Sequence, residues 1–502
     1  MEKILTSAQM READKYTIES LGVPSLELME RAGKALCETA EKIAPNGKIL
    51  CVCGGGNNGG DGFVCARLLR EKNRDVSVVF FAEKTSVDCA ENKEKYLAGG
   101  GEILSDIQAE NKLSLVVDCL LGTGFHGELT GQMKEIADKI NALQTSGVKV
   151  LSADIPSGLN GENGIAAEGA VRATHTLCIG EKKTGVCMGD GLDFAGEVLR
   201  ADIGIALPQE EKTYARLLDK EEIQRLIKPR KRNSHKGTYG KAAIVAGSER
   251  YTGAAALALS ACLRAGAGYT TLFTPEKLLS AFWLKYPEAL LESLNDGGRV
   301  AFNEQNFEKL LDYNAVAYGM GMGVSEDVAK GACWLLKHYG GRLILDADGL
   351  NSLAKYGKVD EAFAQKKCDV LITPHIKEFS RLTGESVQAI LEKGAFAPVA
   401  FAKRHGVCVL LKNAATSLTD GQRVCVNVVG ASGQAKGGSG DVLSGVIAGL
   451  CASGLSAFDG GKAGAYITGT AAQIAAQKSG EYSLLASDVI AALGQAFLTV
   501  LP

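Results

Sequence analysis

The sequence predicts an α/β protein with two domains, the second larger than the first. Three observations support this prediction. The chain has 502 residues, which is too long for one ordinary hydrophobic core. Short apolar runs alternate with stretches of helical periodicity in both halves. A charged stretch at residues 208–236 lies between the two series and is expected to be a connector with one short helix.

The N-terminal half is expected to begin with two helices and to continue as a doubly wound parallel sheet. Ser7 is the predicted N-cap of the first helix, and the second follows the glycine and proline of residues 22–24. In such a sheet the ligand site lies outside the carboxyl ends of the strands. The predicted strands are residues 48–53, 76–81, 113–120, 148–155 and 174–179.

The C-terminal half shows the same alternation of strand-like and helical patterns. A long apolar helix is expected near its end, at residues 442–454. Its predicted strands are residues 241–247, 269–274, 315–319, 341–348, 369–374 and 406–412.

Composition narrows the functional classes. A net charge of -3 and a pI near 6.2 argue against a nucleic-acid or membrane-surface partner. The short basic cluster at residues 228–232 is interpreted as solvated linker. The 14 cysteines lie mostly in apolar runs, which predicts reduced thiols and a cytoplasmic location. Neither a signal core nor an uncharged run long enough to span a bilayer is recognised in the sequence.

The loop after the first predicted strand spells the dinucleotide fingerprint with Gly54, Gly56 and Gly59. Glu83 follows at about the position of a ribose-binding acid, so a redox dinucleotide is one hypothesis. The same loop carries Asn57, Asn58 and Asp61, which are more polar than a phosphate cradle requires. An aspartate aimed at a pyrophosphate would repel it.

Further polar side chains follow other predicted strands of the first half. Asp118, Asp154 and Ser157 should meet the asparagine loop at one edge of the parallel sheet. Asn58, Asp118 and Ser157 offer only oxygen ligands, which suits an alkali cation better than zinc. Each feature alone has a simpler explanation, since an aspartate at a strand end is more often a cap or turn former.

The second half contains a glycine-rich segment, residues 437–440, that leads through Asp441 into the apolar helix. Glycine amides at a helix start bind anions, and Asp441 is expected to stay ionised there and to accept a proton during phosphoryl transfer. Lys412 is either a phosphate ligand or a solvated lysine at a strand end. His375 is a turn residue or a ligand contact. Asp346 and Asp348 either orient water or magnesium or cap the next helix.

These motifs resemble the bifunctional NAD(P)H-hydrate repair enzymes. That family joins an N-terminal NAD(P)HX epimerase, here residues 1–210, through a connector at 211–235 to an ADP-dependent (6S)-NAD(P)HX dehydratase at 236–502. The resemblance covers GGGNNGGDGFVCAR, VDCLLGTGFHGELTG and ADIPSGLNGENG in the first half, and LDADGLN, LITPHIKEFSRL and GGSGDVLSG in the second. It implies a Rossmann-like first domain and a ribokinase-like second domain.

For the first domain, the resemblance implies that Asp154 binds the hydrated dinucleotide and transfers the proton that allows its C6 centre to invert. Potassium would be held by Asn58, Asp118 and Ser157. The remaining implied substrate contacts are Asn57, Asn58, Gly59, Gly60, Asp61, Gly122, Thr123, Gly124, Phe125, His126, Gly127 and Glu128.

For the second domain, the resemblance implies that Asp441 is the catalytic base, with Mg²⁺ as cofactor and ADP as co-substrate. NAD(P)HX would contact Ala254, Gly321, His375 and Asp441. The adenine nucleotide would contact Lys412, Asn413, Ala414, Ala415, Thr416 and Gly440. The expected partners are small molecules, NADHX or NADPHX and ADP, and the protein is expected to be a homo-oligomer.

Three positions depart from the family pattern, and one alternative function stays open. Residues 376–377 replace the usual Pro-Gly, Asn413 replaces a glycine, and Met320 replaces a proline, which predicts altered handling of the nucleotide. The alternative is a ribokinase-like small-molecule kinase with a non-catalytic N-terminal binding module. The product distinguishes them, since a kinase releases a phosphorylated metabolite and a dehydratase regenerates NADH.

Overall fold

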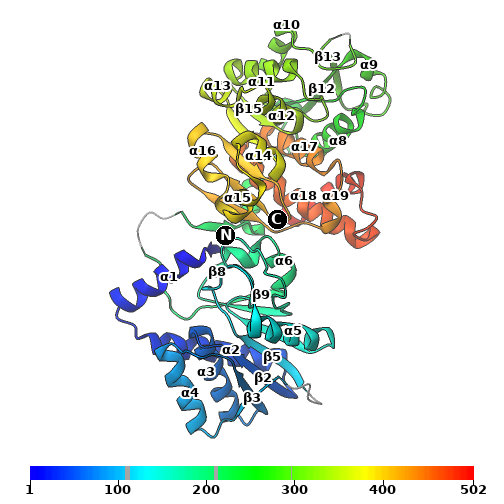
Figure 1. Ribbon diagram of the computed structural model, residues 1–502. Helices are drawn as coiled ribbons and strands as arrows, with labels where there is room; N and C mark the ends of the chain where they lie inside the picture. The colour runs from blue at the N-terminus through cyan, green and yellow to red at the C-terminus, as the bar shows by residue number, and fades with distance from the viewer. Residues whose placement is uncertain (108–112, 209–212, 296, 502) are drawn as a thin grey trace. The chain divides into compact units, whose positions relative to one another are not determined.

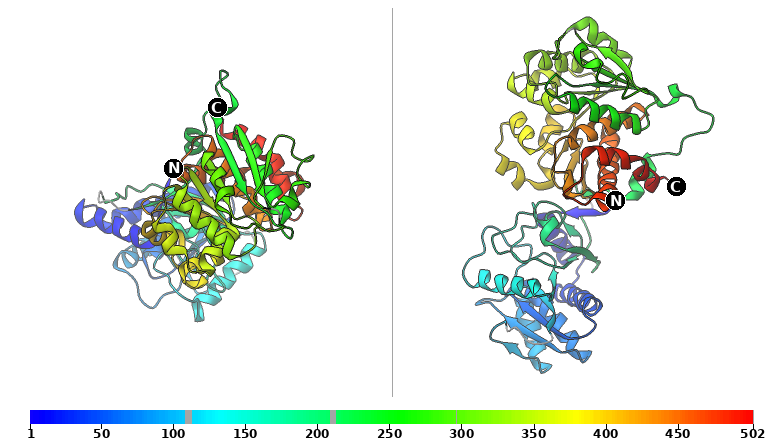
Figure 2. Two further views of the ribbon diagram at one scale, coloured as in Figure 1. Left: turned by 90° about the horizontal axis from the view of Figure 1, so that it is seen from above. Right: turned by 90° about the vertical axis from the view of Figure 1, so that its right-hand side faces the viewer.

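The computed structural model describes residues 1–107, 113–208, 213–295 and 297–501, and the chain divides into two compact units. The N-terminal unit comprises Lys3–Tyr214 with Glu392–Gly394, and the C-terminal unit comprises Met1–Glu2 with the remaining residues. Each unit is a sheet covered by helices (Figures 1 and 2). The predicted α/β class with two domains is confirmed.

The described strands of the N-terminal unit form a parallel sheet in the order β4-β3-β2-β5-β6-β7-β9. Outside this sheet, a short parallel pair joins β1 (Lys3–Leu5) to β8 (Lys182–Lys183). The sheet consists of β2 (Lys48–Cys53), β3 (Val76–Phe80), β4 (Ile103–Leu104), β5 (Leu113–Cys119), β6 (Lys149–Ala153), β7 (His175–Ile179) and β9 (Glu197–Ala201).

Helices cover both faces of this sheet, because successive strand residues point to opposite sides. Cys51 and Cys53 pack with α2, α3 and α4, whereas Leu50 and Val52 pack with α5. The helices are α1 (Ser7–Lys15), α2 (Ser25–Ile43), α3 (Asn57–Glu71), α4 (Val87–Ala98), α5 (Gly131–Thr145) and α6 (Gly191–Phe194), with a π-helix at Tyr16–Ser20 and a 3₁₀ turn at Thr184–Cys187.

The first helix is capped by Thr6, so the prediction of Ser7 as N-cap is wrong. The Thr6 hydroxyl accepts the Gln9 N–H at 3.1 Å, and the Gln9 side chain accepts the Thr6 N–H at 3.0 Å. This reciprocal pair is a capping box, which satisfies two amide groups at once. Ser7 itself is fully buried. A cap one residue earlier gives the better hydrogen-bond geometry because Gln9 then stands at the third helical position.

The C-terminal unit contains a larger sheet in the order β13-β12-β11-β14-β15-β16-β17-β18-β19-β10. Pairing is parallel from β13 to β17, antiparallel through β18 and β19, and parallel again at β10. The strands are β10 (Ala215–Leu217), β11 (Lys241–Val245), β12 (Tyr269–Thr274), β13 (Leu290–Ser293), β14 (Ala315–Tyr318), β15 (Arg342–Leu345), β16 (Asp369–Ile372), β17 (Cys408–Leu411), β18 (Thr416–Thr419) and β19 (Val424–Asn427).

Two groups of helices cover this larger sheet. One face packs on α8, α17 and α18, and the other on α11 to α14 and α16. The helices are α7 (Lys220–Leu226), α8 (Thr252–Arg264), α9 (Glu276–Leu279), α10 (Glu304–Glu308), α11 (Glu326–His338), α12 (Ala347–Lys355), α13 (Val359–Ala364), α14 (Ile376–Thr383), α15 (Val387–Glu392), α16 (Val399–His405), α17 (Ser439–Ala452), α18 (Ala457–Ser479) and α19 (Ala486–Val500), with 3₁₀ turns at Lys236–Tyr239, Lys309–Asp312, Gly394–Phe396 and Ser432–Gln434.

Helix α17 lies against α8 with almost no side chain between their backbones. A Cβ atom at Gly445 would lie 2.2 Å from the Ala258 carbonyl oxygen, and one at Gly449 would lie 2.7 Å from the Ala265 Cβ. Contacts this short exclude any residue larger than glycine at both positions. The close approach fixes α17, which begins at the glycine-rich segment, against the sheet.

Part of the expected connector folds into the C-terminal unit. Strand β10 extends the sheet next to β19, and α7 buries Ile223 completely. The Glu222 carboxylate accepts a hydrogen bond at 2.6 Å from the buried Lys462 ammonium of α18. The C-terminal unit therefore includes residues 215–226, and the basic cluster at 228–232 beyond them is exposed.

All 14 cysteines have free thiols, and every one except Cys333 is buried. Cys51 and Cys53 lie on the same face of β2 without a disulfide. Among the described residues, no helix is both long and apolar enough to cross a membrane.

Candidate active sites

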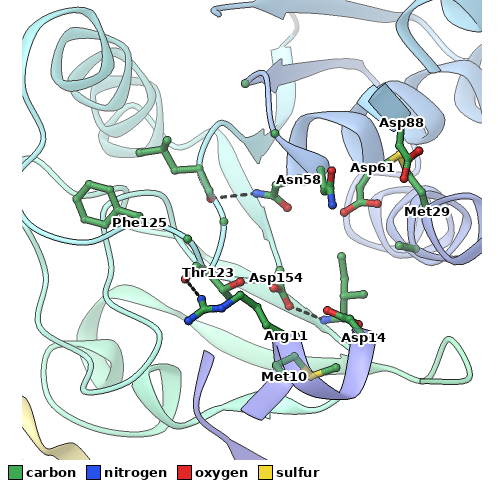
Figure 3. A pocket seen from close by; sticks show the side chains of 18 of the residues that line it. Met10, Arg11, Asp14, Met29, Asn58, Asp61, Asp88, Thr123, Phe125 and Asp154 are labelled. Carbon is green, nitrogen blue, oxygen red and sulfur yellow. Dashed lines mark hydrogen bonds between the residues drawn. The ribbon is translucent and has the colours of Figure 1, made fainter. Parts of the chain in front are cut away.

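A cavity of about 710 Å³ opens in the N-terminal unit at the carboxyl ends of β2 and β5 (Figure 3). The chain winds outward from β2 to β4 on one side and from β5 to β9 on the other. Ligands bind doubly wound sheets at such a reversal of strand order. Helices α1 and α2, the start of α3 and the loops after β5 and β6 supply the walls.

The glycines of the first loop allow close packing of the backbone. A Cβ atom at Gly59 would lie 1.8 Å from the Gly54 carbonyl oxygen, and one at Gly54 would lie 2.0 Å from the Leu120 carbonyl oxygen. Gly56 meets nothing within 4 Å and is the N-cap of α3. The glycines of the fingerprint are therefore explained by the tight turn that connects β2 to α3.

Some residues of this loop line the cavity, and others are buried behind its wall. Asn57, Asn58 and Asp61 line the cavity at the start of α3. Gly59 and Gly60 are buried and lie outside its walls. Glu83 is exposed and also lies outside the walls, which removes the ribose contact of the redox hypothesis.

Asp118 and Ser157 form a buried hydrogen-bonded pair beneath the cavity wall. The Ser157 hydroxyl donates to Asp118 Oδ1 at 2.6 Å, and the Ser157 N–H and the Ser152 hydroxyl donate to Oδ2 at 3.0 and 2.8 Å. Burial raises the pKa of Asp118, and these hydrogen bonds oppose the increase. The Ser157 hydroxyl also accepts the Leu121 N–H at 2.9 Å, which connects the pair to the loop after β5.

Asn58 completes a set of oxygen atoms that fits an alkali cation. Its Nδ2 donates to the Leu121 carbonyl oxygen at 3.0 Å, but its buried Oδ1 has no hydrogen-bond partner among the described residues. A buried carbonyl oxygen normally has a partner, so this atom is suited to a missing ligand. Asn58, Ser157 and Asp118 meet through Leu121, and their donor atoms are all oxygens.

Asp154 follows β6 with a φ of 67°, a left-handed conformation that is uncommon for residues other than glycine. Its carboxylate accepts the Ile179 N–H at 2.9 Å and pairs with the Lys183 ammonium. Lys183 also donates to the Ile179 carbonyl oxygen at 2.7 Å and is completely buried. The strained backbone and this buried lysine hold the Asp154 carboxylate at the cavity.

Two further carboxyl groups point into the same space from different helices (Figure 3). Burial raises the pKa of Asp14 on α1 to about 6, with Lys183 opposing and Asp154 adding to the increase. Burial raises the pKa of Asp61 well above its usual value, with Asp154 and Asp14 adding to the increase. The cavity walls therefore carry four carboxyl groups, those of Asp14, Asp61, Asp88 and Asp154, together with the buried Lys183 ammonium.

Sequence reasoning missed Asp14, Lys183 and Arg11 as residues of this site. All three line the cavity, and Arg11 donates to the Thr123 carbonyl oxygen at 3.3 Å. Asp14 and Arg11 belong to the amphipathic first helix, where charged residues usually face solvent. Lys183 is one of two adjacent lysines, and only the strand pair of β1 and β8 determines which one is buried.

The loop after β5 is the outer wall of the cavity. Residues 122–126 line it, and Phe125 lies at its edge in Figure 3. Gly127 and Glu128 are exposed and lie outside its walls, which differs from the predicted contact set. Gly127 has a φ of 91°, which turns the chain away from the cavity at this point.

In the C-terminal unit, Asp441 lies in the first turn of α17, after the N-cap Gly438. Its pKa is raised to about 7, chiefly by burial, with Asp346 and Asp348 adding to the increase and Lys412 opposing it. Asp441 is therefore only partly ionised at neutral pH, whereas the sequence led us to expect a fully ionised carboxylate. Burial, with the neighbouring carboxylates, outweighs the helix dipole, whose effect is about 0.3–1 kcal/mol.

Lys412 is held by Asp346 rather than left in solvent. Its ammonium donates to Asp346 Oδ1 at 2.7 Å, and Ser444 of α17 donates to Oδ2 at 2.7 Å. Burial lowers the pKa of Lys412, but Asp346 and Glu378 raise it by more. A Cβ atom at Gly440 would lie 3.2 Å from the Lys412 Nζ, so the lysine is directly beside the glycine-rich segment.

The carboxylates of Asp346 and Asp348 both accept hydrogen bonds from backbone N–H groups of the protein. Asp346 Oδ1 caps α12 by accepting the Ala347 N–H at 2.8 Å, and Asp348 Oδ2 accepts the Gly323 N–H at 2.7 Å. No group of three His, Cys, Asp or Glu side chains in the described ranges is arranged to hold a metal ion. These residues do not fit a magnesium ion held by the protein alone.

His375 is the N-cap of α14 in a capping box. Its Nδ1 accepts the Lys377 and Glu378 N–H groups at 3.1 and 3.2 Å, and Glu378 accepts the His375 N–H at 2.9 Å. Burial lowers the pKa of His375, against the influence of Glu378. Residues 376–377 thus form an ordinary helix start, and the imidazole Nε2 lies 3.5 Å from Glu378 Oε1.

The remaining predicted contacts lie at the start of α8, in the turn after β14 and in the segment after β17. Gly321 has a φ of 62°, and a Cβ atom there would lie 2.7 Å from the Ala254 Cβ, so these two residues are adjacent. Met320 is completely buried, and its carbonyl oxygen accepts the Gly247 N–H at 2.9 Å. In the segment from Lys412 to Thr416, Asn413 and Ala414 are exposed whereas Ala415 is buried.

Comparison with known proteins connects both sites to one family. Residues 25–185 match the family model of the YjeF-related protein N-terminus, and residues 242–494 match that of the NAD(P)H-hydrate dehydratases. The chain is 35% identical to the bifunctional NAD(P)H-hydrate repair enzyme of Thermofilum pendens over 500 residues, which are 96% of this chain and 94% of the relative. The chain belongs to the family of bifunctional NAD(P)H-hydrate repair enzymes.

Other members of this family and one solved structure agree with the assignment. The repair enzyme of Escherichia coli is 30% identical over 96% of this chain and 92% of its own length. An ADP/ATP-dependent NAD(P)H-hydrate dehydratase of Bacillus subtilis, crystallised with ATP and Mg²⁺, is 26% identical with a TM-score of 0.50. It covers 57% of this chain and 99% of its own. A ribokinase-like superfamily protein of Enterococcus faecalis has the same TM-score of 0.50 at 22% identity, which confirms the ribokinase-like fold expected for the C-terminal domain.

Proposed function

We propose that this chain repairs hydrated NADH and NADPH in two steps. The N-terminal domain interconverts the R and S hydrates, and the C-terminal domain dehydrates the S hydrate with ADP. The observation that carries the proposal is the likeness to bifunctional repair enzymes along nearly the whole chain, including both domain models. We place the epimerase domain at residues 1–210 and start the dehydratase domain at residue 215, where β10 begins.

In the epimerase domain, the hydrated nicotinamide would bind in the 710 Å³ cavity. Asp154 would accept or donate the proton that moves when the C6 hydroxyl leaves and returns. Its hydrogen bond from Ile179 and its pairing with Lys183 keep the carboxylate oriented for this role. Asn57, Asp61 and residues 122–126 would contact the rest of the dinucleotide.

Asn58, Asp118 and Ser157 would hold potassium in the epimerase domain. The unpartnered Asn58 Oδ1 supports this assignment, because a cation would satisfy it. A bound cation would supply positive charge next to the loop after β5, where a pyrophosphate or hydroxyl oxygen of the substrate could lie.

In the dehydratase domain, the C6 hydroxyl of the hydrate would attack the terminal phosphoryl group of ADP while Asp441 accepts its proton. AMP would leave, and loss of phosphate from C6 would restore the ring double bond. Lys412 lies beside Gly440 and would neutralise charge on the transferring group. Ala254, Gly321 and His375 would position the hydrate, and Lys412 to Thr416 with Gly440 would bind the nucleotide.

We further propose that Mg²⁺ reaches this domain with the nucleotide phosphates, since the protein carboxylates there are already occupied. The 14 free cysteines support a cytoplasmic location. A homo-oligomer that acts on small molecules, without nucleic-acid or membrane partners, completes the proposal.

One assay tests both activities. Purified protein receives a mixture of R- and S-NADHX with ADP, and NADH absorbance is followed to completion. Complete recovery of NADH is expected, and Asp154→Asn should stop recovery near half. A phosphorylated product without NADH would instead identify a kinase. Failure of the unaltered protein to interconvert the hydrates would exclude the epimerase assignment.

A further inference from the structure

Asp14 lies in the epimerase cavity without any role in the proposed reaction. It projects from α1 toward the same space as Asp154 and Asp61 (Figure 3). Within the part of the chain that the structure describes, its carboxyl group has no hydrogen bond and no ion pair. A partly buried carboxyl group at a cavity wall, with both oxygens available, is suited to contact a ligand hydroxyl.

The charges that face Asp14 come from several elements. Lys183 of β8 and Asp154 after β6 are its strongest electrostatic neighbours, and Asp61 of α3 senses Asp14 in turn. The Lys183 ammonium is already engaged by Asp154 and the Ile179 carbonyl oxygen. Asp154 is therefore the carboxylate that pairs directly with Lys183, whereas Asp14 feels the same ammonium only at longer range.

The surroundings of Asp14 also change its own proton affinity. Burial and Asp154 raise the pKa of Asp14 to about 6, while Lys183 limits the increase. The Asp14 group thus exchanges its proton near neutral pH, as a general acid must. Burial raises the pKa of Asp61 well above its usual value, and Asp154 and Asp14 add to the increase.

We propose that Asp14 is a second catalytic residue of the epimerase site, the acid that protonates the C6 hydroxyl as it leaves, while Asp154 is the base for the water that returns. This inference rests on the proposed epimerase function. It assigns the two directions of proton movement to two separate carboxyl groups on different elements, α1 and the loop after β6.

The step balances as follows. Asp14 gives its proton to the hydroxyl oxygen, the C6–O bond breaks with its electron pair on oxygen, and the N1 lone pair forms a C6–N1 double bond. A water molecule then adds to the opposite face of C6, the π electrons return to N1, and Asp154 takes the surplus proton. Solvent exchange through the open cavity restores the proton on Asp14 and removes it from Asp154.

The test measures conversion of S-NADHX to R-NADHX by the full chain without ADP, so that dehydration does not interfere. Asp14→Asn is compared with Glu12→Gln, an exposed carboxylate on the same helix. We expect Asp14→Asn to lower kcat at least 100-fold with KM within threefold. Glu12→Gln should leave both constants unchanged. In the unaltered protein, kcat/KM should decrease above about pH 6 as Asp14 loses its proton. The residual activity of Asp14→Asn should not show this decrease.

Several outcomes separate this inference from the proposed function. An unaltered protein that does not interconvert the hydrates overturns both. An active protein in which Asp14→Asn keeps a normal kcat overturns this inference alone. So does a variant with raised KM and an unchanged pH profile, since that pattern indicates positioning. Asp14→Ser serves as a second variant if Asp14→Asn fails to fold, and Asp14→Glu should recover part of the rate.

Discussion

The Lys412 ammonium donates a hydrogen bond to Asp346 Oδ1 at 2.7 Å, next to the glycine-rich start of α17. Asp346 is almost completely buried and is also bound by Ser444 of α17. The lysine proposed to meet the nucleotide is thus positioned before any nucleotide arrives. Preorganised charge of this kind costs no reorganisation during the reaction.

Asp346→Asn should weaken both dehydration and stability. We expect kcat/KM for ADP to decrease about 10-fold to 100-fold, because Lys412 loses its charged partner. Breaking a buried ion pair from one side should also cost about 3 kcal/mol in the unfolding free energy of the C-terminal unit. Steady-state kinetics and calorimetry measure the two effects. Asp360→Asn removes an exposed partner of Arg404 and should change neither.

Dehydration should require the ionised form of Asp441. Its pKa of about 7 predicts that kcat/KM increases tenfold per pH unit below pH 7 and levels off above it. Asp441→Asn should abolish this dependence together with most of the activity. A pH profile that is flat between pH 5 and 8 in the unaltered protein would contradict the assignment of Asp441 as base.

The same carboxyl group should reduce stability as pH rises. The folded pKa of Asp441 is above the unfolded value of 3.8, so the folded state binds more protons between about pH 4 and pH 7. Its contribution is fully present below pH 4 and is lost as pH increases through 7. Asp441→Asn should therefore stabilise the C-terminal unit at pH 8 by about 1–3 kcal/mol, and by much less at pH 4, as measured by urea unfolding.

Asn58→Ala should remove the response of the epimerase to potassium. The substitution deletes the buried unpartnered oxygen and the hydrogen bond to the Leu121 carbonyl group. We expect the unaltered protein to epimerise several times faster in KCl than in choline chloride, and Asn58→Ala to show no difference. Asn46→Ala, at an exposed loop position, should retain the salt effect. Equal rates in both salts for the unaltered protein would argue against a potassium site.

Gly59→Ala and Gly56→Ala should have opposite outcomes although both change the dinucleotide spelling. An alanine Cβ at position 59 would lie 1.8 Å from the Gly54 carbonyl oxygen, whereas one at position 56 meets nothing within 4 Å. Overpacking of this severity should cost at least about 1–3 kcal/mol and abolish epimerisation. Gly56→Ala should change stability by less than about 1 kcal/mol. Thermal unfolding of both variants, with dehydration as the internal control, measures the difference.

Most of the fold could be predicted from periodicity, because buried parallel strands are continuous apolar runs. The strands that begin near Lys48, Leu113 and Lys241 were all predicted from such runs. Short strands such as β4 and β10 were missed because two or three residues carry no periodicity. The position of the first helix cap was missed by one residue, which is the usual ambiguity between adjacent Thr6 and Ser7.

The site residues could be predicted from the sequence only where polar residues directly follow a predicted strand. Asp154 and Asn58 follow strands directly, and the structure places both at the cavity. Lys183 and Asp14 were missed, because their burial depends on tertiary packing of β8 and α1 that has no local signature. The raised pKa of Asp441 was missed for the same reason, since Asp346 and Asp348 are distant in sequence.

The close contact of α17 with α8 limits where the C-terminal unit can move. A helix whose Gly445 and Gly449 face neighbouring backbone cannot tilt or slide without opening voids along its length. We therefore expect Asp441 to keep its place relative to the sheet when ligands bind. A movement around a nucleotide is expected instead at the exposed turn of Asn413 and Ala414.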